Sequence, residues 1–189
     1  MFRKGKSVYL RPFSTSDVPT LQRWMNDQET TRYLMNVFPI TERHEGEWVE
    51  NHGKNRNEVV LAIVTVKGDK LIGSIGLHAI SWTNRTATTG TFIGDKKCRG
   101  KGYGTEAKML LLDFAFHTLD LYAILSRVMD YNAPSLAYAK KCGYEEVGRI
   151  PGWTRRQDGK RCGEVLLLVT QAQWEPRWQA YLKAKAPKK

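Results

Sequence analysis

A glycine-rich, basic segment that separates a β-type stretch from a helical stretch is the feature that most restricts how this chain can fold. The segment reads Arg99-Gly100-Lys101-Gly102-Tyr103-Gly104-Thr105. Glycines at alternate positions let a backbone approach a ligand closely and leave its N–H groups exposed. The positive end of the following helix points at the same place, and Arg99 and Lys101 add full positive charge. The segment therefore predicts a strand–loop–helix unit that binds an anion, with a diphosphate as the best fit.

The spacing of these glycines differs from that of two well-known phosphate-binding motifs. A nucleotide P-loop requires Gly-x-x-x-x-Gly-Lys-Ser/Thr, a string that the sequence does not contain. The dinucleotide fingerprint requires Gly-x-Gly-x-x-Gly, whereas the spacing here is Gly-x-Gly-x-Gly after a predicted antiparallel meander. A flexible surface turn is the alternative for any glycine cluster. The loop alone therefore indicates an anion site without identifying the anion.

Apolar periodicity and turn signals divide the chain into alternating elements. Strands are predicted over residues 8–11, 58–66, 71–80, 86–93, 122–129, 147–150 and 164–170. Helices are predicted from Ser16-Asp17, from Thr41, over 105–119 as an amphipathic helix, and from Asn132 to Gly143. This order predicts an α/β fold of the mixed α+β type, in which a twisted, mostly antiparallel sheet carries helices on both faces. We expect a single domain over 1–182 and a basic, disordered tail over 183–189.

Charge and cysteine content restrict the partners and the compartment. The sequence holds 30 Lys and Arg against 19 Asp and Glu, a net charge of +11, which attracts nucleic acid, a ribosomal surface or a phosphorylated cofactor. Part of the excess lies in residues 96–108. No run of 18 apolar residues and no signal-peptide block occur, so we expect a cytoplasmic protein with no membrane partner. The cysteines, Cys98, Cys142 and Cys162, lack metal-ligand spacing, which predicts free thiols and no metal site.

The glycine loop resembles the Arg/Gln-x-x-Gly-x-Gly/Ala signature of the GNAT superfamily of acyl-CoA N-acetyltransferases. The resemblance extends along almost the whole chain, to the branch that contains the ribosomal-protein alanine N-acetyltransferases. The other matching strings are Leu10-Arg11-Pro12, Asn26-Asp27, Tyr33-Leu34, Phe38-Pro39-Ile40-Thr41, Leu71-Ile72-Gly73-Ser74-Ile75-Gly76-Leu77, Asn84-Arg85, Phe92-Ile93-Gly94-Asp95-Lys96, Asn132-Ala133-Pro134-Ser135 and Lys141-Cys142-Gly143-Tyr144. One string would carry little weight, whereas this ordered set is specific.

This resemblance implies an acetyl-CoA site. Backbone amides from Gly100 to Thr105 would hold the diphosphate, with the side chains of Arg99 and Lys101 nearby. The strand that ends at Phe92-Ile93 would separate from its neighbour and pair its backbone with the pantetheine arm. Asn132 and Ser135 would lie near that arm on the far side. Asn132 also suits the N-cap of the helix that follows it, and both roles can hold together.

The expected general base is missing from its usual position. In this branch the strand before the loop usually reads Ala-Glu-x-Gly, and the Glu often acts as general base through water. Here the string is Ala87-Thr88-Thr89-Gly90, so Thr88 occupies that position. A threonine hydroxyl positions water or substrate but cannot hold a proton from an amine at neutral pH. His78, in the neighbouring strand, is the titratable candidate for this role, and hairpin parity could place it on either face.

The expected general acid is displaced as well. In many members of the superfamily a tyrosine seven residues after the Asn protonates the departing thiolate. Position 139 is alanine here, and Tyr138 lies one residue earlier, about a hundred degrees around the helix. A packed or surface tyrosine is the alternative for Tyr138. Ser135, one turn after Asn132, is an alternative proton donor.

The acceptor follows from these departures. Deprotonating a lysine-like amine at pH 7 costs roughly 4.6 kcal/mol, whereas a terminal α-amine costs only about 1.1 kcal/mol. We therefore expect transfer to a primary amine, above all the α-amine of a protein N-terminus, with ribosomal proteins among the candidates. A small-molecule amine (antibiotic, polyamine or amino acid) is one alternative, and a CoA-binding protein with little catalysis is another. Nucleic acid is not expected as a substrate, because only the net charge points to it and no recognised nucleic-acid-binding motif supports it. The sequence leaves open whether the protein forms a homodimer.

Overall fold

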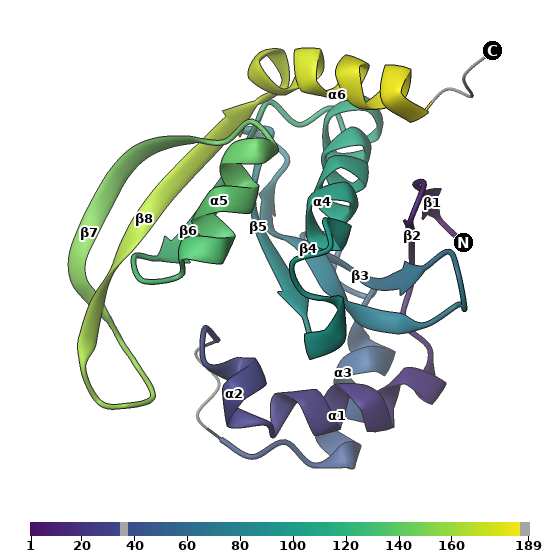
Figure 1. Ribbon diagram of the computed structural model, residues 1–189, viewed down its shortest axis with the longest axis vertical. Coiled ribbons are helices and arrows are strands. Elements are labelled where there is room, and N and C mark those ends of the chain that lie inside the picture. Colours follow the sequence, from purple (N-terminus) through teal and green to yellow (C-terminus); the bar gives the residue numbers. More distant parts are fainter. Residues whose placement is uncertain (35–37, 186–189) are drawn as a thin grey trace.

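The protein folds around one mixed sheet with helices on both faces (Figure 1). The computed structural model describes residues 1–34 and 38–185. Within them the strands lie in the spatial order β1-β2-β3-β4-β5-β6-β8-β7. Their bounds are β1 Arg3–Lys4, β2 Val8–Arg11, β3 Val59–Thr65, β4 Leu71–Ser81, β5 Thr86–Ile93, β6 Ala123–Met129, β7 Glu145–Arg155 and β8 Arg161–Thr170. Neighbours run antiparallel except for the parallel pair β5–β6, so the predicted fold class is confirmed.

The helices flank this sheet in two groups. Their bounds are α1 Val18–Met25, α2 Gln28–Thr31, α3 Glu42–Asn51, α4 Tyr103–Asp113, α5 Ala133–Lys141 and α6 Gln171–Lys185. In Figure 1, α1 to α3 lie together at one end of the sheet, whereas α4 and α5 lie across it and α6 crosses above them. Within the described residues, no helix combines the length and apolarity that a bilayer span requires, and the cysteines form no disulfide.

Several boundaries differ from the sequence prediction. The helix α4 begins at Tyr103 rather than Thr105, and it continues into a π-helical turn over Phe114–Thr118. The short helix α2 and the C-terminal helix α6 were not predicted. Because α6 runs to Lys185, the first three residues of the expected disordered tail, 183–185, are helical. The remainder of that tail, 186–189, lies outside the described residues.

Alternate residues of β5 face the two helix groups. The ring of Phe92 packs edge-on against Trp24 of α1, with ring centroids 6.1 Å apart. Thr89 instead accepts a hydrogen bond from Lys108 of α4. The even-numbered residues of β5 therefore face α1 and the odd-numbered ones face α4. This division decides on which side of the sheet each candidate residue lies.

A single carboxylate holds the beginning of α4 in place. Glu106 accepts hydrogen bonds from the backbone N–H groups of Lys6, Ser7 and Val8, at 2.5, 2.9 and 3.2 Å. The Oη of Tyr181 in α6 also donates to Glu106, at 2.7 Å. Because Glu106 lies in the first turn of α4, these contacts fix the glycine loop relative to the β1–β2 hairpin and to α6.

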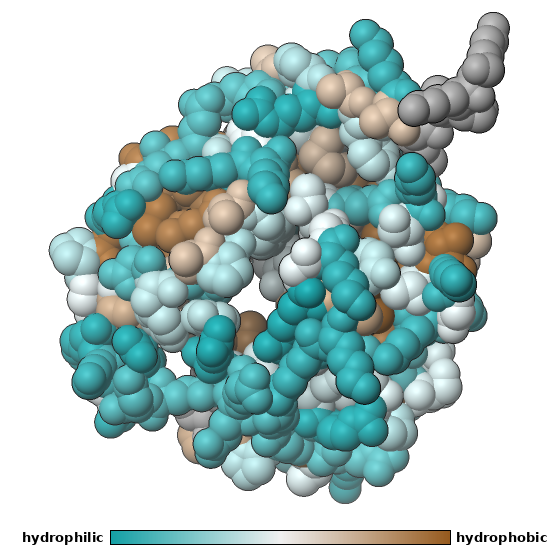
Figure 2. Space-filling view, in the orientation of Figure 1, coloured by the Kyte–Doolittle hydropathy of each residue, from teal (hydrophilic) through white to brown (hydrophobic). Residues whose placement is uncertain are grey.

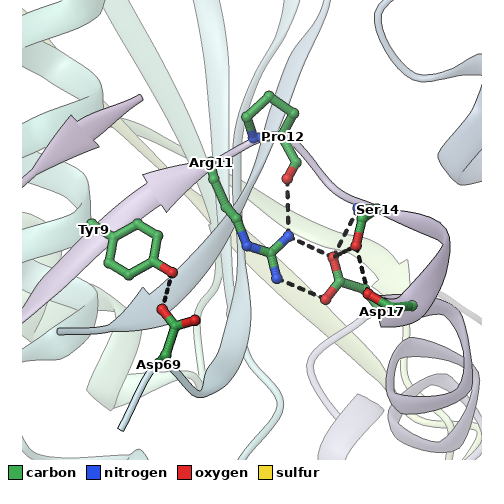
Figure 3. A network of polar contacts seen from close by, with 7 residues as sticks. Tyr9, Arg11, Pro12, Ser14, Asp17 and Asp69 are labelled. Atoms are coloured by element: carbon green, nitrogen blue, oxygen red, sulfur yellow. Dashed lines mark hydrogen bonds and ion pairs between the residues drawn. The ribbon is translucent and has the colours of Figure 1, made fainter. Parts of the chain in front are cut away.

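An ion pair sets the direction of α1 relative to β2 (Figure 3). The guanidinium of Arg11 donates to both carboxylate oxygens of Asp17, at 2.6 and 2.8 Å. Burial would raise the pKa of Asp17, but the hydrogen bonds from Arg11 and Ser14 outweigh it and leave that pKa below its usual value. On the other side of Arg11, Tyr9 donates to Asp69 of the β3–β4 turn. These contacts join the end of β2 to the start of the α1 layer.

Candidate active site

The glycine loop forms an open turn at the N-terminus of α4. Gly100 and Gly102 have φ angles of 74° and 83°, and a Cβ on either residue would meet nothing within 4 Å. Their conformation, rather than crowding, therefore requires glycine. Gly102 is the N-cap of α4, so the first N–H groups of the helix, which lack intrahelical partners, are presented at the loop. The Nε of Arg99 donates to the carbonyl oxygen of Ile93 at 3.0 Å and ties the loop to the end of β5.

Strands β5 and β6 separate beside this loop. Their register pairs are Thr86 with Ala123, Ala87 with Ile124 and Thr88 with Leu125, and no further pair forms although β5 continues to Ile93. Beyond that point the hydroxyl of Ser126 reaches the carbonyl oxygen of Thr89 at 3.5 Å. The β6-facing edge of residues 90–93 is therefore left without a strand partner in the described structure. Figure 2 shows the molecule hollowed in this region, between α5, α2 and the end of β5.

A histidine–glutamate pair lies on the α1 side of the sheet. The Nδ1 of His78 in β4 lies 2.5 Å from Oε1 of Glu58, which precedes β3. The Nε2 of His78 lies 3.0 and 3.6 Å from the positions that a Cβ would take on Gly76 and Gly90. Gly76 and Gly90 are register partners, so the imidazole lies over a glycine floor that spans β4 and β5. The second ring nitrogen therefore points along the sheet toward the unpaired part of β5.

Thr88 lies beside this pair but makes a structural contact. It is the register partner of His78, and its Oγ1 donates to the carbonyl oxygen of His78 at 3.2 Å. The hydroxyl proton of Thr88 is therefore engaged with the backbone. Sequence reasoning singled out His78 and Thr88 but missed Glu58, because a contact between residues 20 apart follows from strand register rather than from a local motif.

The residues of α5 lie on the opposite side of the sheet. The side chain of Asn132 accepts from the backbone N–H of Ser135 at 3.2 Å, so Asn132 caps α5. Tyr138 packs against the core, and burial raises the pKa of its hydroxyl while Thr91 of β5 and Ser135 act to lower it. Tyr138 therefore faces the odd-numbered side of β5. The candidate bases and the candidate acids flank the same strand from opposite faces.

A buried lysine, which sequence reasoning counted only as part of the basic stretch 96–108, lies in this layer. Lys108 of α4 is 1% exposed, and burial lowers the pKa of its amine to about 7. Its Nζ donates to Oγ1 of Thr89 at 2.7 Å. The one available signal was its place between the apolar residues Ala107 and Met109 of a helix.

The tip of the β7–β8 hairpin closes over the α2 end of the molecule. The rings of Tyr131 and Tyr33 have centroids 5.3 Å apart, and the guanidinium of Arg156 lies 4.3 Å above Tyr131. The side chain of Gln157 donates to the carbonyl oxygen of Thr31 at 3.3 Å. The hollow beside β5 is therefore bounded by aromatic and basic side chains on this side.

A cavity of about 750 Å³ opens beside the first residues of β3, next to Glu58. Its apolar lining includes Phe13, Val49, Val60 and Trp82. Val60 is the register partner of Gly76, so this cavity adjoins the glycine floor under His78. It is large enough for amino-acid side chains on the α1 side of the sheet.

Comparison with known proteins identifies the family of this chain. The family model described as the acetyltransferase (GNAT) domain matches residues 7–145, which include β2 to β6, the glycine loop and α5. The chain belongs to the GNAT acetyltransferase family. It is an acyl-CoA N-acyltransferase, and GNAT acetyltransferases use acetyl-CoA as the acetyl donor. Within the described residues no three His, Cys, Asp or Glu side chains gather into a metal site.

Relatives of this GNAT acetyltransferase include bacterial and animal proteins. The Bacillus subtilis protein named Probable N-acetyltransferase YjcK is 31% identical over 156 residues, which cover 77% of this chain and 84% of that protein. The human Alpha/beta-tubulin-N-acetyltransferase 9 is 25% identical over 192 residues, which cover 92% of this chain and 85% of that protein. Spermidine N-acetyltransferase from Vibrio cholerae, solved with CoA and spermine, has a TM-score of 0.82 at 20% identity, covers 89% of this chain and 98% of its own, and shares the fold.

Proposed function

We propose that this GNAT acetyltransferase acetylates the α-amine of a polypeptide acceptor, with His78 as the general base. The observation that carries the proposal is the pairing of His78 with Glu58, which leaves Nε2 directed over Gly76 and Gly90. A carboxylate on one nitrogen orients an imidazole and stabilises the cation that forms when the other nitrogen takes a proton. Thr88, the other sequence candidate on this face of β5, donates its hydroxyl proton to the backbone and so does not serve as a base.

The loop and the open edge of β5 fit acetyl-CoA. The positive φ angles and open surroundings of Gly100 and Gly102 leave room for a diphosphate against the first N–H groups of α4. Lys101, which is exposed at the loop, and Arg99 would add charge there. The unpaired edge of residues 90–93 would accept and donate backbone hydrogen bonds to the pantetheine amides, with Asn132 and Ser135 across the opening. Bound acetyl-CoA supplies an activated acetyl thioester.

In this proposal the two proton transfers take place on opposite faces of the sheet, on either side of the hollow beside residues 90–93 of β5. His78 takes the proton of the acceptor amine on the α1 side, with Glu58 holding the imidazole. A backbone N–H of β5, near Phe92 or Ile93, donates to the carbonyl oxygen as negative charge develops on it. Tyr138, or Ser135 beside it, donates a proton on the α5 side.

A polypeptide acceptor suits the surfaces that border the opening. The β7–β8 hairpin carries Arg155, Arg156 and Arg161 beside an exposed Trp153. The positive charge of this surface repels polyamines and aminoglycosides and attracts an acidic peptide. The cavity next to Glu58 offers apolar walls for an acceptor's side chains. A relative is named for acting on tubulin, a protein. A ribosomal-protein N-terminus, the acceptor class of the alanine N-acetyltransferase branch, is the specific candidate within this class, in a cytoplasmic setting.

A panel of matched amines tests the acceptor class. The purified protein is incubated with acetyl-CoA and with four acceptors: a lysine-free peptide with a free α-amine, an N-terminally blocked peptide with one lysine, spermidine and an aminoglycoside. Mass spectrometry of the products is expected to show acetylation of the free α-amine, and its loss in His78→Gln. Acetylation of spermidine or the aminoglycoside alone contradicts the proposal.

A further inference from the structure

A buried amine lies directly behind the point where β5 and β6 separate. Thr89 is the first residue of β5 beyond the last register pair, Thr88 with Leu125. The Nζ of Lys108 donates to Oγ1 of Thr89 at 2.7 Å from the α4 side. With 1% of its surface exposed, Lys108 is as buried as the core leucines around it.

Hydroxyls and aromatic rings surround this amine. Its Nζ lies 5.7 Å from the ring centroid of Tyr138 and 5.6 Å from that of Tyr144. The Oη of Tyr144 and the Oγ1 of Thr91 are buried and make no hydrogen bond of normal geometry, although Thr91 is close enough to lower the pKa of Tyr138 and Thr89 to lower that of Tyr144. Native proteins rarely leave such groups unpaired unless a water, a ligand or a function accounts for them. This layer is therefore a polar cluster built into the core against the candidate site.

The titratable groups that face Lys108 come from α5 and the turn after it. They are Tyr138, Cys142 and Tyr144, and Arg177 of α6 lies beyond Cys142. Burial raises the pKa of the two tyrosine hydroxyls, and it raises that of Cys142 to about 12, so all three stay neutral at physiological pH. Burial lowers the pKa of Lys108 to about 7, and Cys142 acts in the opposite direction. Lys108 is therefore the group of this cluster that changes charge near neutral pH.

We propose that Lys108 is a positioning residue for acetyl transfer, whose ammonium group behind Thr89 stabilises the negative charge that forms on the sulfur of coenzyme A. The inference rests on the proposed placement of the pantetheine arm along residues 90–93. In the transfer the acceptor nitrogen bonds to the acetyl carbon, the C–S bond breaks, and its electron pair stays on sulfur, which then takes a proton from Tyr138 or Ser135. Lys108 keeps its own proton throughout.

Low polarity around the cluster makes one buried charge effective. A fixed positive charge in a water-poor site acts more strongly on a developing anion than the same charge in solvent. A neutral side chain at position 108 would not provide this stabilisation.

The thiol of bound coenzyme A gives a readout that needs no acceptor. Thiolate absorbance in the ultraviolet is followed against pH for CoA on the parent protein, on Lys108→Met and on Lys141→Met, an exposed lysine of α5 as matched control. The complex with desulfo-CoA serves as the blank for protein thiols and tyrosines. The bound thiol is expected to have a pKa lower by about one unit or more on the parent and on Lys141→Met than on Lys108→Met. Equal values on the parent and Lys108→Met overturn the inference.

Turnover gives a second, independent readout. With any acceptor that the panel identifies, kcat of the parent is expected to fall as pH rises above about 7, where Lys108 loses its proton. Lys108→Met should lower kcat roughly tenfold or more and abolish the fall of kcat above pH 7. A folded Lys108→Arg variant keeps the charge, so its kcat should fall only at higher pH. Thermal unfolding checks that Lys108→Met folds, as expected for an apolar side chain of similar length.

The two proposals fail separately. If α-amines are not acetylated but the thiol shift is present, the acceptor class is wrong and the role of Lys108 stands. If α-amines are acetylated but Lys108→Met leaves the thiol pKa and the pH profile of kcat unchanged, the role of Lys108 is wrong and the acceptor class stands.

Discussion

The Nδ1 of His78 lies 2.5 Å from Oε1 of Glu58, so a carboxylate directly before β3 orients an imidazole on the neighbouring strand β4. The two side chains are 41% and 33% exposed, which keeps the pair within reach of a substrate. The glycine floor under the ring, Gly76 and Gly90, removes the side chains that would otherwise separate Nε2 from β5. A base can therefore reach the open strand although Thr88 occupies the usual position of the carboxylate.

Replacing Glu58 by Gln should lower kcat about tenfold to a hundredfold, because the neutral amide can hold the wrong tautomer of the ring and does not stabilise its protonated form. Steady-state kinetics at saturating acetyl-CoA measure the effect. Glu50→Gln, on the exposed surface of α3, is the matched control and should behave like the parent. A Glu58→Gln enzyme with parental kcat would remove Glu58 from the mechanism.

Replacing Gly102 by Val should weaken coenzyme A binding. Gly102 has a φ of 83°, a conformation that costs an L-residue about 1–2 kcal/mol, which corresponds to roughly 5- to 30-fold in affinity if the loop must hold it to bind. Gly68→Val is a matched control, since Gly68 has a φ of 86°, equally open surroundings and a place in the β3–β4 turn. Calorimetry should show the loss for Gly102→Val alone. An unchanged dissociation constant for Gly102→Val would exclude the loop as the diphosphate site.

The sequence predicted the elements whose signals are local. The three strands from β3 to β5, the turn chemistry between them and the glycine loop each lie within a few residues, and all were found where expected. The cap of α5 by Asn132 is equally local. Short or atypical helices escaped prediction: α2 has one turn, and α6 carries Pro176 in its interior.

The site residues that escaped prediction depend on long-range contacts. Glu58 acquires its role only when the β3–β4 register brings it beside His78. Lys108 was counted only as part of the basic stretch 96–108, and its helix was expected to be amphipathic. The structure instead buries every residue from 107 to 112, since α4 is covered by the sheet on one side and by α5 and α6 on the others. A lysine on such a helix has no solvent to reach, and sequence periodicity does not show that covering.

Glu106 should contribute to stability as well as to placing the loop. Its carboxylate accepts from three backbone N–H groups and from Tyr181, so Glu106→Gln weakens several charge-assisted bonds at once. We expect a loss of about 1.5–3 kcal/mol in the free energy of unfolding, measured in urea. Glu47→Gln, which breaks an exposed pair with Arg43, should cost about 0.5 kcal/mol or less. Equal losses of unfolding free energy for the two variants would contradict this role of Glu106.

His117 should make stability fall as pH rises through the neutral range. Its Nδ1 lies 3.0 Å from Asp113 and its Nε2 lies 2.9 Å from Glu175 of α6, so both nitrogens face carboxylates and the doubly protonated ring is favoured. The hydrogen bond with Asp113, followed by that with Glu175, raises the pKa of His117 above its usual 6.5, against the effect of burial.

The sign of that dependence follows from the raised pKa. The contribution of His117 is complete below pH 6.5, where folded and unfolded chains both bind the proton, and it is lost as pH rises through the higher folded pKa. Lys108, whose folded pKa is lowered, acts oppositely above pH 7, so the test is the difference between the parent and His117→Gln in urea unfolding. That difference should shrink from pH 5.5 to 8.5. A difference that is constant or grows over this range would show that the imidazolium does not hold α6 against the end of α4.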